Sequence, residues 1–395
     1  MVSDTRRMML KALGSAVALG TFGIERSTAR FDSRRIAQQY LENDDLLDND
    51  ELEQGLRRLA NRYSEKISIR EIGSSNQNRP IFAVEVGSGD KHVMALGQQH
   101  GDEMIAPAEG LLSVANFFAM NESSAERILD EVTLHLIPRV NPDGFVARQR
   151  WNVDTSAPAR SSDAGIFADD GTFFTANREG IGWDVNRYHW FDWTESPLYR
   201  NFPDEYPRNP VPEARAVVGS VTDVDPEWII DYHRQGIYTI DEDATYDPDD
   251  PGEAYRREEY PPDPDNHGGG DVVSTSLFWG IHENIPKETL DRSKQLVWTI
   301  YDGIRDLKGT TVSRFPGGTY PGITRNAYGR GGYPTALFEI SAGTLGDRAF
   351  RIEQVFRSML AASAATAEGS MFDVDPDNVR RLPERHVNDF IAGES

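Results

Sequence analysis

The stretch Leu96-Gly-Gln-Gln-His100-Gly-Asp-Glu103 decides which fold we expect for this chain. The apolar run before it has the composition of a buried strand, and the strand stops at a glycine. Polar side chains that follow such a strand lie at the edge of a sheet. His100 and Glu103 are three residues apart, and imidazole nitrogen and carboxylate oxygen both suit Zn²⁺. The stretch therefore predicts two ligands of a metal site at the end of a buried strand.

Apolar patterns on both sides of this stretch predict alternating strands and helices. Short runs of β-branched residues predict strands, and longer segments with apolar residues at helical spacing predict helices. We therefore expect an α/β fold, a three-layer α/β/α structure with a mixed, mostly buried sheet. The expected strands are 67–72, 81–86, 92–96, 132–137, 228–232 and 335–340, and the expected helices are 49–63, 106–120, 212–221, 287–307 and 350–367.

The charge of the chain is strongly negative, with a formal net value of −23. Such a surface repels nucleic acid and anionic membranes, so we expect neither as a partner. Only six of the 41 basic residues are Lys. Acid-rich, Lys-poor composition resembles that of proteins from salt-loving archaea, where salt screens the self-repulsion. The chain contains no Cys, which excludes disulfides and thiol catalysis.

The N-terminus closely resembles a twin-arginine export signal. Arg6 and Arg7 are followed by Leu10, Lys11 and the small and apolar run 12–24. Such a signal is an address read by a receptor and no part of the fold. We therefore expect an exported protein, extracellular or at the cell surface, with no stable membrane insertion unless the leader stays uncleaved as an anchor.

Three of the expected strands end in, or carry, a residue that suits one metal centre. Ligands of open α/β sheets bind beyond the carboxyl ends of strands, so His100, Glu103 and His233 can converge there. Two His and one Glu with an open fourth position make a catalytic zinc set, which lowers the pKa of a bound water toward about 7. Glu339, in the last strand, is the candidate for taking the proton of that water. His135, at a strand centre, is expected to be a core histidine. Four further histidines fit no ligand pattern: His189, His267, His282 and His386.

Seven fragments follow one another along the chain: His100-Gly-Asp-Glu103, Asn141-Pro-Asp-Gly144, Arg150-Trp-Asn152, Gly182-Trp-Asp-Val-Asn-Arg187, Pro212-Glu213, Asp231-Tyr-His233 and Phe338-Glu339-Ile340. In this order they resemble the zinc carboxypeptidases of the carboxypeptidase A/B family. The resemblance implies one zinc ion per chain, the three-layer fold above, and hydrolysis of the C-terminal peptide bond. It also implies that the zinc carboxypeptidase-like catalytic domain spans 47–367. With the N-terminal motif and the composition we therefore expect three further parts: a signal segment (1–30), an acidic linker (31–46) and a polar C-terminal tail (368–395).

The resemblance implies roles for further residues. Arg150 would polarise the scissile carbonyl and stabilise the oxyanion, with Arg148 as the alternative. Asn186 and Arg187 would hold the terminal carboxylate of the substrate. Asp184 would orient a zinc histidine.

The segment before the last strand departs from the pattern of the family. Relatives place a tyrosine on a mobile loop there, and in this shortened segment Tyr320 is the candidate, whereas Tyr328 is expected to be structural. Arg325 stands where many relatives have Asp, near the region that lines the specificity pocket. It would either favour an acidic side chain or second carboxylate on the substrate, or pair with a surface acid, and the sequence leaves both open.

We therefore expect a monomeric zinc metallocarboxypeptidase that acts on peptides with a free C-terminal carboxylate. One alternative uses the same centre on another amide, such as a cell-envelope peptide or an N-acyl amino acid. Another, a zinc-holding binding module without catalysis, would lack the base or the oxyanion group, and candidates for both are present. The preferred C-terminal residue stays open, as does the role of the acidic loop 241–271, either a Ca²⁺ site or a solvated insertion.

Overall fold

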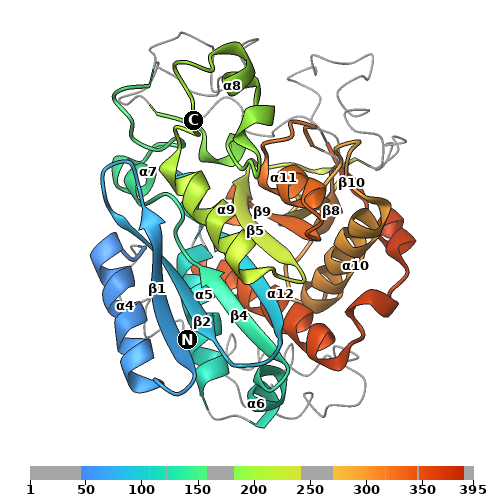
Figure 1. The fold of residues 1–395 in the computed structure, drawn as a ribbon. Coiled ribbons are helices and arrows are strands. Elements are labelled where there is room, and N and C mark those ends of the chain that lie inside the picture. Colours follow the sequence, from blue (N-terminus) through green and yellow to red (C-terminus); the bar gives the residue numbers. More distant parts are fainter. Residues whose placement is uncertain are drawn as a thin grey trace.

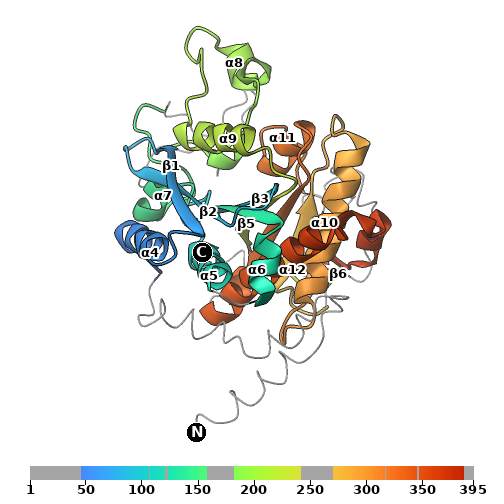
Figure 2. The same ribbon diagram turned by 60° about the horizontal axis from the view of Figure 1, so that its bottom comes forward.

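The computed structural model describes residues 46–105, 107–120, 123–157, 182–241, 270–315, 317–344 and 347–386. Within these ranges a ten-stranded mixed sheet runs through the molecule, with helices on both faces (Figures 1 and 2). The strand order is β1-β2-β4-β3-β5-β9-β7-β8-β10-β6. The expected three-layer α/β/α fold is thereby confirmed.

The centre of the sheet is parallel and its flanks are mixed. The neighbours β4, β3, β5 and β9 run parallel, β1 and β2 pair antiparallel at one edge, and β7 runs antiparallel to β9. Every residue of β4 and β7 is buried, as expected for strands that are covered on both faces. The strands are β1 (Ile67–Ser74), β2 (Pro80–Val86), β3 (Lys91–Gly97), β4 (Val132–Ile137), β5 (Ile229–Gln235), β6 (Ile240–Asp241), β7 (Thr275–Trp279), β8 (Val312–Arg314), β9 (Thr335–Ser341) and β10 (Glu384–Arg385).

Helices cover the two faces of the sheet unequally. One layer contains α4 (Asn49–Arg62), α5 (Pro107–Ala119), α6 (Ser123–Leu129), α10 (Lys287–Ile304) and α12 (Arg348–Glu368), and the other contains α9 (Pro212–Val224) and α11 (Thr324–Arg330). The segment between β4 and α9 carries the short helices α7 (Pro142–Ala147) and α8 (Pro197–Asn201).

Alternation along β3 shows how one strand serves both layers. Val93 and Ala95 belong to the larger core beneath α5 and α12, whereas Met94 and Leu96 belong to the smaller core beneath α9. Successive side chains of a strand point to opposite faces, so an uninterrupted apolar run is required here. The same run ends at Gly97, directly before the loop that carries His100 and Glu103.

The residues that the sequence assigns to a polar tail are folded as far as His386. After α12 the chain forms two short 3₁₀ helices, η7 (Met371–Asp373) and η8 (Pro376–Arg381), whose apolar residues pack into the larger core. It then enters the sheet as β10, parallel to β8 and antiparallel to β6. The sheet is therefore extended by residues far beyond the last predicted strand.

Several predicted segments lie outside the described residues: the signal segment 1–30, nearly all of the linker 31–46 and nearly all of the acidic loop 241–271. In the part of the chain that is described, no helix has the length and apolarity needed to cross a bilayer.

Candidate active site

The loop that follows β3 holds His100 in a fixed backbone conformation. Gln98 has a φ of 54°, a left-handed conformation that few residues other than glycine adopt. Its carbonyl accepts a hydrogen bond from the backbone N–H of Asn141 at 3.1 Å, and its side-chain oxygen accepts one from Nε of Arg139 at 2.8 Å. The chain thus turns out of the sheet at a position secured by the end of the neighbouring strand β4.

Gly101, next to His100, is required by close backbone packing. A Cβ at this position would lie 1.9 Å from the carbonyl carbon of Gly144. The backbone N–H of Gly101 donates to the carbonyl of Arg150 at 3.3 Å. The loop after β3 is therefore pressed against the segment that follows β4.

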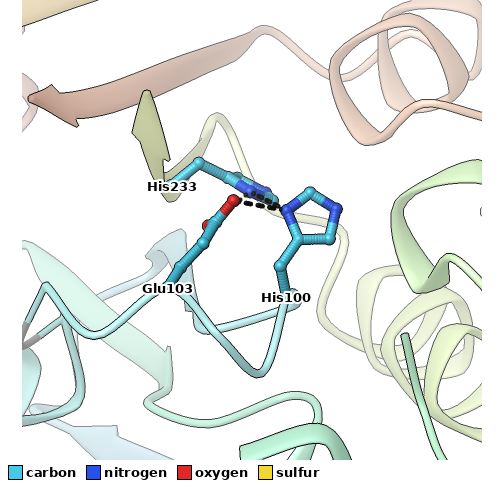
Figure 3. A group of neighbouring side chains, drawn as sticks. All are labelled: His100, Glu103 and His233. Atoms are coloured by element: carbon cyan, nitrogen blue, oxygen red, sulfur yellow. Dashed lines mark hydrogen bonds and ion pairs between the residues drawn. The ribbon is translucent and has the colours of Figure 1, made fainter. Parts of the chain in front are cut away.

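His100, Glu103 and His233 converge with their polar atoms toward one another (Figure 3). Nδ1 of His100 lies 2.6 Å from Oε1 of Glu103, and Nδ1 of His233 lies 3.1 Å from Oε2. The two Nδ1 atoms are 3.1 Å apart. All three residues are buried, and His233 reaches the cluster from β5. Two imidazoles and one carboxylate in this arrangement are a donor set that suits a catalytic zinc.

The two histidines and the carboxylate of the cluster shift one another's pKa values. Burial raises the pKa of Glu103, but His100 and His233 outweigh it and hold that pKa well below its usual value. Burial lowers the pKa of His233, and the carboxylates of Asp231 and Glu103 outweigh burial and raise it. Glu103 is therefore an anionic ligand at neutral pH.

A second carboxylate stands behind each histidine. Asp184 Oδ1 lies 3.1 Å from Nε2 of His100, and Asp231 Oδ2 lies 3.0 Å from Nε2 of His233. Both rings are thereby oriented with Nδ1 toward Glu103. Asp231 has no role in the sequence prediction, although a residue two positions before His233 in a strand lies on the same face.

Arg150 lies beside the cluster. Its Nε donates to Oδ2 of Asp184 at 3.0 Å, and its Nη1 is 3.9 Å from Oε1 of Glu103. The alternative, Arg148, is exposed and ends α7 with a φ of 50°. Of the two arginines, the geometry favours Arg150 for contact with a substrate at the metal centre.

Glu339 lies on β9 directly opposite His233 on β5. Its Oε2 is buried and has no hydrogen-bond partner in the described part of the chain. Burial raises the pKa of this carboxyl above its usual value; His233 opposes that rise and Glu103 adds to it. A carboxylate in this position can accept a proton beside the metal centre.

Asn186 and Arg187 lie on the 3₁₀ turn that follows Asp184. Asn186 Oδ1 accepts hydrogen bonds from the backbone N–H of Thr324 at 2.9 Å and from its hydroxyl at 2.6 Å, and its Nδ2 lies 3.2 Å from Nε2 of His233. Nη1 of Arg187 donates to the carbonyl of Asn186 at 2.8 Å. The Asn186 amide thus joins the turn to α11.

Tyr320 is brought close to Arg187. Burial raises the pKa of Tyr320, and the positive charge of Arg187 opposes this rise. The ring of Tyr320 lies 6.1 Å from that of Trp190. The predicted carboxylate clamp and the predicted loop tyrosine therefore share one region.

Arg325 is buried and engages the backbone. Its two Nη atoms donate to the carbonyls of Trp279 at 2.6 Å and of Gly318 at 2.9 Å. Its guanidinium also faces the ring of Phe278 at 5.4 Å. These contacts place Arg325 behind the loop that carries Tyr320, a role that neither sequence interpretation includes.

A buried network that the sequence did not predict supports His233 from behind. Nε2 of Gln99 donates to Oδ2 of Asp231 at 2.7 Å and to the hydroxyl of Thr324 at 2.8 Å. Oε1 of Gln99 lies 2.5 Å from Nε2 of His189, whose Nδ1 lies 2.8 Å from the hydroxyl of Tyr328. Burial lowers the pKa of His189 to about 4, so this histidine is neutral at pH 7.

This chain is similar to known carboxypeptidases over part of its length. The family model for zinc carboxypeptidase matches residues 52–310, a range that contains the clustered residues His100, Glu103 and His233 and ends before Glu339. Carboxypeptidase SOL1 of Arabidopsis thaliana is 32% identical over 115 residues, which cover 27% of this chain and 23% of that protein. Carboxypeptidase B of Astacus astacus is 33% identical over 101 residues, which cover 25% of this chain and 33% of that protein. The matched length is thus about a quarter to a third of these curated relatives.

Two solved structures share the fold. The structure of thrombin activatable fibrinolysis inhibitor has a TM-score of 0.55 at 15% identity and covers 83% of this chain and 78% of its own. Carboxypeptidase A of Helicoverpa armigera has a TM-score of 0.54 at 15% identity and covers 91% of this chain and 81% of its own. At this identity the likeness concerns the arrangement of helices and strands.

Proposed function

Because this chain belongs to the zinc carboxypeptidase family, we propose that it hydrolyses the C-terminal bond of peptides that end in a free carboxylate. The observation that carries the proposal is the convergence of His100, Glu103 and His233, with Glu339 directly across from His233 on the next strand. These residues supply a zinc donor set and an adjacent base.

The donor set fits zinc in number and type. His100 and His233 would bind through Nδ1, since Nε2 of each is engaged by an aspartate, and Glu103 would bind through its carboxylate. Zinc held there would supply Lewis acidity, polarising a substrate carbonyl and making water more acidic. Three protein ligands leave a coordination position open, as catalysis requires.

Two side chains of the protein would transfer the proton of the attacking water and stabilise the negative charge that develops on the substrate oxygen. Glu339 takes a proton from the attacking water and passes it to the nitrogen of the leaving amino acid, and the raised pKa that burial gives this carboxyl favours the first of these steps. Arg150 donates to the oxygen on which negative charge develops. Loss of such a donor commonly lowers kcat by about 10²- to 10³-fold.

Arg187 is our first candidate for the terminal carboxylate. A guanidinium can donate two parallel hydrogen bonds to a carboxylate, and Tyr320 lies within reach of the charge of Arg187. Asn186, whose Oδ1 is held by Thr324, has only its Nδ2 hydrogens to offer. We assign Asn186 the accompanying contact.

Hydrolysis of blocked dipeptides tests this proposal. The assay compares free and amidated C-termini, in the presence and absence of a chelator, for the wild type, Glu339→Gln and the exposed control Glu283→Gln. We expect release of the free C-terminal residue, loss on chelation, recovery with zinc, and a Glu339→Gln variant that binds zinc without turnover. The control should behave as the wild type.

Two outcomes would contradict the proposed function and indicate another one. Equal cleavage of amidated peptides would show that the carboxylate is not recognised, and N-acyl amino acids and cell-envelope peptides would then be the substrates to try. Zinc binding without hydrolysis of any amide would indicate a binding module.

We further propose that the chain is exported as a monomer and works in high salt. Export is proposed from the arginine pair and apolar run at the N-terminus, and function in high salt from the acidic, Lys-poor composition. Replacement of both Arg6 and Arg7 by Lys should retain the protein inside the cell. Light scattering at several salt concentrations measures the mass of the purified protein.

A further inference from the structure

Glu213 is a buried acid that takes no part in the steps proposed above. It is the second residue of α9 and has no exposed surface. Its Oε2 accepts a hydrogen bond from Nδ2 of Asn152 at 2.9 Å, and its Oε1 accepts one from the backbone N–H of Asn76 at 3.0 Å. The two oxygens of this carboxyl are therefore held by neutral donors from two different segments of the chain.

Burial makes the ionised form of Glu213 unfavourable. It raises the pKa of this carboxyl to about 7, although the hydrogen bonds from Asn152 and Asn76 oppose the rise. An acid whose pKa is higher in the folded chain than in the unfolded chain does not stabilise the fold through its charge. The charge of Glu213 therefore does not explain why an acid occupies this position, and the contact with Asn152 is the feature that needs a reason.

Asn152 joins two segments that carry residues of the active site. Its backbone N–H donates to the carbonyl of Trp183 at 3.0 Å, and its Oδ1 accepts from the backbone N–H of Trp183 at 2.8 Å. Arg150 lies two residues before Asn152, and Asp184 directly follows Trp183. If the amide of Asn152 flipped, its oxygen would face the carboxylate of Glu213, so this carboxylate keeps Oδ1 turned toward Trp183.

The bonds of Asn152 are the tighter constraint on the segment of Arg150. The carbonyl of Arg150 accepts from the backbone N–H of Gly101 at 3.3 Å and from Nδ2 of Asn141 at 3.4 Å, which are long hydrogen bonds. The bonds that Asn152 makes are 2.8 to 3.0 Å long. Nε of Arg150 in turn donates to Oδ2 of Asp184, the residue after the one that Asn152 holds.

We propose that Glu213 is a positioning residue for the reaction. Through Asn152 it fixes the segment of Arg150 against the segment of Asp184, and so holds the guanidinium of Arg150 beside the metal cluster. This inference rests on the proposed carboxypeptidase function, in which Arg150 donates to the oxygen that becomes negatively charged.

A double-mutant cycle on peptide hydrolysis tests this role. In Glu213→Gln an amide NH₂ must face one of the two donors, so one hydrogen bond is lost. We expect kcat to fall about tenfold with KM within about threefold, because a small displacement of the oxyanion donor acts on the transition state. In Arg150→Gln protein the same substitution should lower kcat by less than about twofold, since the residue through which it acts is gone.

The matched control is Glu384→Gln, at another buried glutamate. Burial raises the pKa of Glu384 to about 8, and its ion pair is with Arg314 on β8. This variant should keep kcat within about twofold of the wild type even where it unfolds at a lower urea concentration. The control therefore separates the general cost of removing a buried carboxyl from the effect on Arg150.

An exchange of the two side chains should restore the rate. In the double variant Glu213→Gln with Asn152→Asp, one carboxylate oxygen still accepts from the backbone N–H of Trp183 and the other accepts from the new amide, whose own oxygen accepts from Asn76. Every donor then faces an acceptor. We expect kcat within about threefold of the wild type, and zinc affinity, measured by competition with a chromogenic chelator, within about threefold in both variants.

The outcomes separate this role from the proposed function. An unchanged kcat in Glu213→Gln, an equal fold loss in the Arg150→Gln protein, a loss of zinc affinity in proportion to kcat, or an exchange variant as slow as Glu213→Gln would each overturn the positioning role and leave the carboxypeptidase function standing. If Glu213→Gln fails to fold, Asn152→Ser takes its place in the cycle, because it cuts the same link and leaves the bond to Asn76 intact. A zinc-loaded wild type that cleaves no peptide overturns both proposals.

Discussion

Asp231 holds His233 from behind: its Oδ2 accepts a hydrogen bond from Nε2 of that histidine at 3.0 Å. Asp184 does the same for His100 at 3.1 Å. The two carboxylates reach the cluster from different segments, one from β5 itself and one from the turn before Asn186. Each fixes a ring so that Nδ1 faces Glu103. The metal centre is therefore oriented before any ion binds.

Replacement of Asp231 by Asn should weaken zinc binding by about 10- to 100-fold, because an amide is a poorer acceptor and no longer fixes the ring. Competition with a chromogenic chelator at equilibrium measures this affinity without reference to activity. Asp184→Asn is the matched variant for the other histidine, and the exposed Asp223→Asn is the control. Unchanged affinity in Asp231→Asn would mean that His233 is oriented by its packing alone.

The metal ligands could be predicted from the sequence because topology fixes their meeting place. His100 follows β3 and His233 lies near the end of β5, two parallel strands, and the carboxyl ends of such strands share one edge of the sheet. The network behind them could not be predicted in this way. Contacts such as that between Gln99 and His189 join residues 90 positions apart that carry no pattern of their own.

Arg150 should matter for turnover far more than Arg148. We expect Arg150→Gln to lower kcat/KM by about 10²- to 10³-fold, because a donor to the developing oxyanion is lost. Arg148→Gln should stay close to the wild type, since that side chain is exposed. Steady-state assays on one peptide measure both.

Zinc affinity separates the two roles that Arg150 could have. Arg150 also donates to Asp184, so its loss could act through His100. We expect Arg150→Gln to keep most of its zinc affinity, because the contact between Asp184 and His100 does not depend on it. Loss of zinc in proportion to loss of activity would contradict the oxyanion role.

The last part of the fold shows a different limit of prediction. Strand β10 has only two residues, and no periodicity can be recognised over that length. Its place is set by Leu382 and Val379, which enter a core built by distant helices. A polar segment read alone therefore looks like a tail.

His135 should make the fold sensitive to acid. It lies 2.9 Å from His92 and 3.6 Å from Glu85, and burial, with the charges of His92 and Arg70, lowers its pKa from 6.5 to about 4. In the unfolded chain His135 therefore becomes protonated below about pH 6.5, whereas in the folded chain it stays neutral down to about pH 4. This contribution to stability is complete above pH 6.5 and is lost as the pH falls, by at most about 3 kcal/mol.

Urea unfolding of the zinc-free protein at pH 7 and pH 5 measures this effect. Omitting zinc keeps metal release out of the comparison. His135→Gln should lose less stability than the wild type over this range, whatever its stability at pH 7. Equal losses in the two proteins would show that the histidine is protonated without cost to the fold.

Replacement of Gly101 by Ala should displace the loop after β3, which carries His100. The Cβ of an alanine would lie 1.9 Å from the carbonyl carbon of Gly144 and 2.3 Å from its oxygen, and both are backbone atoms that cannot rotate away. One of the two segments must therefore move, at a cost of about 1 to 3 kcal/mol, and His100 moves with the first of them. We expect Gly101→Ala to lose both stability in urea and affinity for zinc.

Gly219→Ala is the matched control, because nothing lies within 4 Å of a Cβ at that position. Gly219 lies within helix α9, where alanine is favoured over glycine by about 0.5 to 1 kcal/mol, so this variant should be slightly more stable than the wild type. The pair separates the loss of chain flexibility, which both substitutions share, from the collision with Gly144. Equal zinc affinity in Gly101→Ala and Gly219→Ala would contradict this prediction. It would mean that the segment after β4 moves while His100 stays in place, and that the contact between Arg139 and Gln98 fixes the position of the loop after β3.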